Sequence, residues 1–119
     1  MNTPALASVR RFAWVAEARP EKIDRYLGLH AAPWPSVNAM IKACNIRNYS
    51  IYVRRIGGVP HLFSYLEYVG ADFAADMARM AADPDTQRWW AECMPCLVAQ
   101  PGLTAPGVWA DAEEIYHLP

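Results

Sequence analysis

Tyr26 and His30 lie four residues apart in an amphipathic stretch of the chain. Residues at this spacing stack on one face of a helix, so a helix here places a phenol beside an imidazole. Histidine gives and takes protons near neutral pH because its unperturbed pKa is about 6.5. Ile23 and Leu27 share the predicted face, which we expect to point at a sheet. His30 is therefore either a hydrogen-bonded core residue or the proton-transfer group of a site.

Trp89 and Trp90 are adjacent in the run Gln-Arg-Trp-Trp at 87–90. On a helix, neighbouring side chains point about 100° apart, so one ring can pack in the core while the other lines a pocket. Flat aromatic rings can pack against the C–H faces of sugars while polar groups hold the hydroxyls. The alternative is that both tryptophans belong to the core.

The segment 48–52, Asn-Tyr-Ser-Ile-Tyr, is a predicted strand that is rich in hydrogen-bonding side chains. Tyr49, Ile51 and Val53 would share one face of it, with Asn48 and Tyr52 on the other. The strand is typical either of a ligand-binding surface or of a sheet edge with amphipathic aromatics.

The chain has three cysteines, and an odd number argues against a disulfide framework. Cys93 and Cys96 have the spacing of a redox motif, but they close a helical pattern, whereas a thioredoxin-type site opens one. No second pair of Cys or His stands at zinc spacing. We therefore favour buried thiols at a helix end over redox or metal chemistry, and we expect no metal.

Hydrophobic periodicity and turn residues predict the elements that must position these side chains. We expect helix starts at Pro20, Ser36, Asp72 and Asp85 or Thr86, with Pro95 distorting the last turn. The last helix would bury Trp90, Cys93, Met94 and Leu97. The predicted strands are 8–17, 46–54, 61–69 and 112–118, with a turn at 57–58 and a loop at 100–107.

This order of strands and helices predicts an α+β, ferredoxin-like split βαβ fold. Its four-stranded antiparallel sheet would carry helices on one face and leave the other face open. We expect one domain over residues 1–119 and a homodimer that covers the open face.

The composition excludes two classes of partner. The 11 basic and 12 acidic residues form no basic stripe, which argues against a nucleic-acid partner. No apolar run approaches the roughly 20 residues that cross a bilayer, and residues 1–9 lack the apolar core of a signal peptide. We therefore expect a cytoplasmic protein.

Taken together, three blocks resemble the L-rhamnose mutarotase family, from Arg10 to His117. The blocks are the Tyr26 and His30 pair followed by Trp-Pro at 34–35, the strand 48–52, and Gln-Arg-Trp-Trp at 87–90; the closing Glu-Ile-Tyr-His-Leu at 114–118 also fits. The resemblance implies a dimeric α/β barrel of ferredoxin-like chains. It also implies an isomerase that interconverts the anomers of a 6-deoxy-hexose, L-rhamnose or L-fucose, without a metal or cofactor.

By the same resemblance His30 is the proton donor, and Tyr26, Tyr49, Trp89 and Trp90 contact the sugar. The chain departs from the family at Ser36, where an acidic residue is common, and in the segment between residues 97 and 111. Two other functions fit the same fold. One is a non-catalytic sugar- or metabolite-binding module, and the other is a cofactor-free oxygenase, which would need a more apolar pocket.

Overall fold

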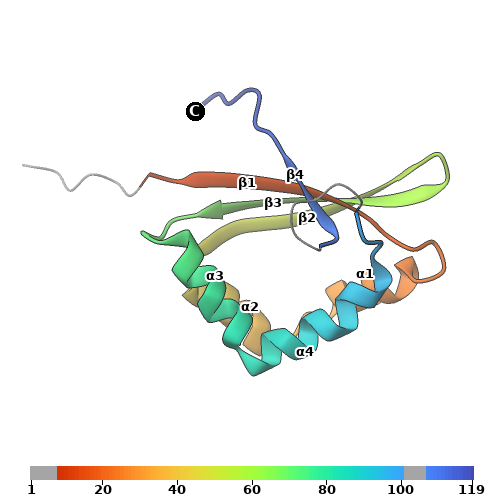
Figure 1. The fold of residues 1–119 in the computed structure, drawn as a ribbon, viewed down its shortest axis with the longest axis horizontal. Helices are drawn as coiled ribbons and strands as arrows, with labels where there is room; N and C mark the ends of the chain where they lie inside the picture. The colour runs from red at the N-terminus through yellow and green to blue at the C-terminus, as the bar shows by residue number, and fades with distance from the viewer. Residues whose placement is uncertain (1–7, 101–106) are drawn as a thin grey trace, which may run out of the picture.

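The computed structural model describes residues 8–100 and 107–119 (Figure 1). Four strands form one antiparallel sheet in the order β2-β3-β1-β4. They are β1 (Arg10–Glu17), β2 (Ile46–Ile56), β3 (Val59–Tyr68) and β4 (Trp109–Ala112). A strand from the second half of the fold thus lies between β1 and β2, as the ferredoxin-like prediction requires.

Four helices cover one face of this sheet (Figure 1). They are α1 (Ile23–Ala31), α2 (Pro35–Ala43), α3 (Phe73–Ala82) and α4 (Pro84–Cys93), and a short 3₁₀ turn, η1 (Met94–Cys96), follows α4. Burial alternates strictly along β3, because every second side chain lies beneath the helices. None of the described helices is long and apolar enough to cross a membrane.

The hairpin between β2 and β3 forms where the sequence predicts it. Gly57 and Gly58 have φ values of 60° and 80°, the left-handed region that both central residues of a type I′ turn require. Glycine enters this region without steric cost, so the pair fixes the register of the two strands.

The start of α3 confirms the prediction, whereas the start of α4 corrects it. The Asp72 carboxylate accepts a hydrogen bond from the Ala75 amide and caps α3. In α4, Asp83 is the cap and Pro84 the first helical residue, one or two positions before the predicted start at Asp85 or Thr86. The reason is that proline has no N–H to lose in a first turn.

The same effect of proline corrects the start of α2. Ser36 was expected to be the N-cap, but Trp34 holds that position with φ −75° and ψ 126°, and Pro35 follows as the first helical residue. A residue before proline is driven to such extended angles. Helix α1 also begins later than predicted, at Ile23, because Pro20 lies in a turn that precedes it.

Helix α4 buries a different face from the predicted one. Thr86, Trp89 and Cys93 are buried, whereas Trp90 and Met94 are 40% and 41% exposed. The observed and predicted stripes differ by one residue and both contain Cys93, so the apolar spacing alone did not choose between them. The predicted distortion near Pro95 is confirmed by the 3₁₀ turn η1.

The last strand was also predicted wrongly. Strand β4 ends at Ala112, where it pairs with Ala13 of β1, and residues 113–119 form no strand. The apolar residues that indicated a strand at 112–118 are instead highly exposed: Ile115 91%, Tyr116 76% and Leu118 75%. Most of the predicted loop at 100–107 lies outside the described residues.

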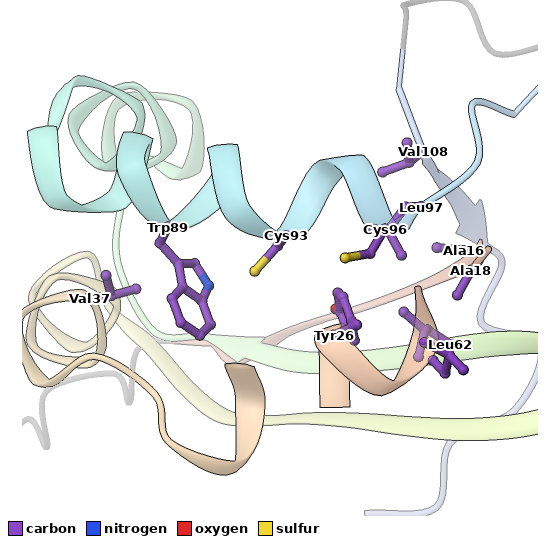
Figure 2. Packing of buried hydrophobic residues seen from close by; sticks show 11 residues of the cluster. Ala16, Ala18, Tyr26, Val37, Leu62, Trp89, Cys93, Cys96, Leu97 and Val108 are labelled. Carbon is purple, nitrogen blue, oxygen red and sulfur yellow. The ribbon is translucent and has the colours of Figure 1, made fainter. Parts of the chain in front are cut away.

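Two separate clusters form the core beneath the sheet. The larger joins α1, α4, η1 and the sheet, and Figure 2 shows Trp89 and Cys93 projecting from α4 into the same interior as Tyr26 and Val37. The smaller lies under α2 and α3 and contains Cys44, Ile46, Leu66 and Met80.

Candidate active site

A cavity of about 1300 Å³ opens between the sheet and the helices. Its lining takes residues from both core clusters, including Tyr26 and Trp89 from one and Leu66 and Met80 from the other. Small-molecule sites commonly measure roughly 300–1000 Å³, so this cavity is large enough to hold a monosaccharide. A smaller hollow of about 520 Å³ lies on the other face of the sheet.

All five predicted site residues line the larger cavity: His30, Tyr26, Tyr49, Trp89 and Trp90. They come from three elements that are distant in sequence, α1, β2 and α4. The fold therefore brings together side chains that the sequence places in separate blocks.

His30 is half-buried, and its Nδ1 lies 2.8 Å from the backbone carbonyl oxygen of Tyr26. A carbonyl oxygen can only accept a hydrogen bond, so Nδ1 must carry the proton and donate it. In the neutral ring this leaves Nε2 with the free lone pair. The backbone of α1 thus selects the neutral tautomer in which Nε2 can accept a proton.

Aromatic packing fixes the plane of the imidazole. The Tyr26 ring stacks on His30 with 4.2 Å between centroids and 26° between planes, and Trp89 meets His30 at 5.2 Å and 65°. Trp34 in turn meets Trp89 edge-on at 5.2 Å. The His30 ring therefore packs against two predicted site residues, Tyr26 and Trp89. Trp34 packs against Trp89 in turn.

The tyrosine hydroxyls and the thiol that line the cavity stay protonated near neutral pH. Burial raises the pKa of the Tyr26 hydroxyl, and the nearby Tyr49 raises it further. Desolvation also raises the pKa of Tyr49, although 42% of its surface is open. The pKa of the Cys93 thiol rises to about 12, chiefly through burial. These groups can donate hydrogen bonds, but they do not supply an anionic base.

The thiols are structural. Cys44, Cys93 and Cys96 are all free and buried. A redox cysteine needs an accessible thiolate, which burial opposes. The geometry agrees with the prediction of buried thiols at a helix end.

One rim of the cavity is polar. Asn38 and Lys42 of α2 line this rim together with Arg47 of β2. The Arg47 guanidinium donates 2.9 Å and 2.8 Å hydrogen bonds to the backbone oxygens of Lys42 and Ile46. Among the described lining residues there is no carboxylate, and the described part of the chain contains no group of three His, Cys, Asp or Glu that could hold a metal.

Sequence reasoning missed the floor of the cavity. Trp14 of β1 and Ser64 of β3 are cross-strand partners that line it, and Ile51 of β2 pairs with Ser64 on its other side. Ser64 is only 4% exposed. The two-residue alternation of β3 could have placed Ser64 inside, but nothing local marks Trp14 as a pocket residue.

Comparison of the sequence with known proteins identifies a family. The family model for L-rhamnose mutarotase matches residues 11–118. An L-rhamnose mutarotase from Shouchella clausii (strain KSM-K16) is 30% identical over 108 residues, which are 91% of this chain and 97% of that protein. The L-rhamnose mutarotase of Escherichia coli (strain K12) is 27% identical over 109 residues, with 92% and 98% covered.

The fold agrees with a solved structure. The crystal structure of an L-rhamnose mutarotase from Formosa agariphila matches with a TM-score of 0.66 at 21% identity, covering 92% of this chain and 99% of that chain. At this identity the likeness concerns the fold.

Proposed function

Since the chain belongs to the L-rhamnose mutarotase family, a family of isomerases, we propose that it interconverts the α and β anomers of L-rhamnose in the cavity beneath its sheet. The observation that supports this most directly is the placement of His30. The Tyr26 carbonyl holds its Nδ1, and its ring lines a cavity with aromatic walls.

The reaction moves one proton between two oxygens of the sugar. The Nε2 lone pair of His30 accepts the proton of the hydroxyl on C1. The C1–O5 bond then breaks, its electron pair goes to O5, and C1 becomes an aldehyde. The imidazolium returns the same proton to O5, C1 rotates, and the reverse steps close the ring on the other face.

A single imidazole can serve both proton transfers because both oxygens are bonded to C1 and are therefore close together in the ring form. The sugar is uncharged before and after the reaction, so no cationic clamp is needed. Neutral Tyr26 and Tyr49 hydroxyls would hold the sugar in place, which agrees with their raised pKa values.

The cavity walls favour a 6-deoxy sugar. Trp89, Trp90 and Trp14 offer flat apolar surfaces to a methyl group and to C–H faces. Glucose would have to bury an additional hydroxyl, and leaving it unpaired costs on the order of 1–3 kcal/mol, or about 5- to 150-fold in binding. We propose L-rhamnose as the substrate, with L-fucose as the second 6-deoxy candidate.

We also propose that the protein is a homodimer in which a second copy covers the open face of the sheet. The cross-strand partners Val15 and Phe63 lie on this face, and Tyr52 is 65% exposed there. Covering such apolar surface favours association.

The experiment that tests the function compares three sugars side by side. Anomer exchange of L-rhamnose, L-fucose and D-glucose is measured by NMR saturation transfer with the wild-type protein. We expect higher kcat/KM for the 6-deoxy sugars than for glucose. Equal values would contradict the 6-deoxy assignment, and sugar binding without any exchange would favour the binding-module alternative.

A further inference from the structure

Strand β2 contains a bulge directly beside the cavity. Arg47 pairs with Glu67 and Ser50 pairs with Tyr65, so Asn48 and Tyr49 together face the single residue between these partners on β3. Asn48 has φ 49°, in the left-handed region. Among residues with a side chain, asparagine is one of the few that enter this region readily.

The bulge decides which face of the sheet Tyr49 occupies. Beyond it, Ile51 pairs with Ser64 on the side beneath the helices, and Tyr49 lines the cavity on that side. Ile46, before the bulge, is also buried on that side. An uninterrupted alternation from Ile46 would put residues 49 and 51 on the opposite, open face, because one extra residue reverses the alternation.

The contact that holds the bulge lies on the open face. Asn48 Nδ2 donates a 2.7 Å hydrogen bond to Glu67 Oε1, and Tyr65 Oη donates a 2.7 Å bond to Glu67 Oε2. Glu67 and Tyr65 alternate with the buried residues of β3, so they point away from the helices. The two hydrogen bonds also lower the pKa of Glu67, and Arg11 and His117 add a smaller effect in the same direction.

We infer that Asn48 and Glu67 are positioning residues: their hydrogen bond on the open face of the sheet stabilises the bulge that directs Tyr49 into the sugar cavity on the other face. Substrate affinity then depends on a hydrogen bond between two residues that do not contact the sugar. The role of Tyr49 as a sugar contact belongs to the proposed function, and to that extent the inference rests on it. The effect of the hydrogen bond between Asn48 and Glu67 on the position of Tyr49 does not depend on the proposed function.

The test uses Glu67→Ala, which removes the acceptor, and Glu67→Gln, which keeps an accepting oxygen. Glu114→Ala is the matched control, because Glu114 is a carboxylate on the same face that bonds to Arg11 and not to the bulge. Loss of one sugar hydrogen bond corresponds to roughly a 2- to 12-fold rise in KM for L-rhamnose. We expect this rise in Glu67→Ala, with kcat nearly unchanged, and KM close to wild type in Glu67→Gln and Glu114→Ala.

A double-mutant cycle separates positioning from general destabilisation. If Glu67 acts through Tyr49, Glu67→Ala adds no further rise in KM in a Tyr49→Ala background. The full rise in that background, or an unchanged KM in Glu67→Ala alone, would overturn the inference.

A spectroscopic measurement keeps the inference testable if no exchange is found. The six tyrosines are labelled with 3-fluorotyrosine, and Tyr49→Phe identifies the ¹⁹F signal of residue 49. We expect this signal to move in Glu67→Ala and to stay in Glu114→Ala. A stationary signal would refute the bulge mechanism, whereas an inactive wild type with a moving signal would refute only the mutarotase assignment.

Discussion

At the scale of residues, the site depends on how one imidazole is held. The Tyr26 carbonyl determines which nitrogen of His30 carries the proton, while the Tyr26 and Trp89 rings restrict the plane of the imidazole. A proton-transfer group needs this restriction because small displacements from a reacting atom lower rates sharply. The hydroxyls of Tyr26 and Tyr49 stay protonated near neutral pH, which supports the proposal that His30 is the residue that exchanges protons.

The two tryptophans of α4 should behave differently when truncated. Trp89 is 8% exposed and packs on His30, so Trp89→Ala should lower the free energy of unfolding by about 3–5 kcal/mol. Trp90 is 40% exposed, so Trp90→Ala should cost little stability and mainly raise KM for the sugar. Urea unfolding followed by circular dichroism checks both; equal destabilisation would contradict the packing described here.

The sequence was sufficient to predict residues of the cavity wall but not those of its floor. Tyr26 and His30 share a helix face, a relation visible in the spacing alone. Trp14 and Ser64 meet only through the register of β1 and β3, which no local pattern contains. Long-range pairing explains why these two residues were missed.

At the scale of elements, the wrongly predicted starts of α2 and α4 share a cause. Helices α2 and α4 each begin on a proline, preceded by a residue in an extended conformation. The predicted starts at Ser36 and at Asp85 or Thr86 left these prolines outside the helices, although the first turn of a helix accepts them. The final strand was misplaced because its apolar residues carry no local sign that β1 pairs with residues 109–112 instead.

The junction of β2, β3 and α3 is held by a carboxylate whose protonation should affect stability. Asp76 accepts hydrogen bonds from Tyr68 and Asn45, and both lower its pKa from 3.8. A lowered folded pKa means that the stabilisation is complete above the unfolded value and is lost as pH falls through the folded value. Asp76→Asn should therefore be less stable than wild type near neutral pH, and the difference should shrink on acidification below about pH 4.

Urea midpoints measured near neutral pH and in acid check this expectation. Glu21→Gln, which changes an exposed carboxylate on the turn before α1, serves as the control. A stability difference for Asp76→Asn that stays constant with pH would show that the hydrogen bonds do not depend on the charge of Asp76.

At the scale of the whole molecule, the cavity divides the core. Two hydrophobic clusters flank a space that could otherwise be filled by side chains. A site of this kind is built at a cost in stability. Apolar side chains on the open face of the sheet, such as Phe63 and Tyr52, offer surface that association could bury.

The proposed dimer gives a direct prediction of mass. Sedimentation of the wild-type protein should give twice the 13.4 kDa mass of one chain. Tyr52→Lys places a charge on the open face, where Tyr52 is 65% exposed, and should shift the protein towards monomer. Leu27→Lys, at a 42% exposed position on α1, should leave the mass unchanged; dissociation by Leu27→Lys alone would place the interface on the helices.

We propose that this protein exchanges the anomers of L-rhamnose through His30. The most direct measurement is NMR saturation transfer between the two anomeric protons of L-rhamnose, with wild-type protein and with His30→Ala. We expect wild-type exchange well above the spontaneous rate and a loss of about 10²- to 10⁴-fold in His30→Ala. Circular dichroism should show that the variant is folded. Equal exchange in a folded His30→Ala protein would contradict the account.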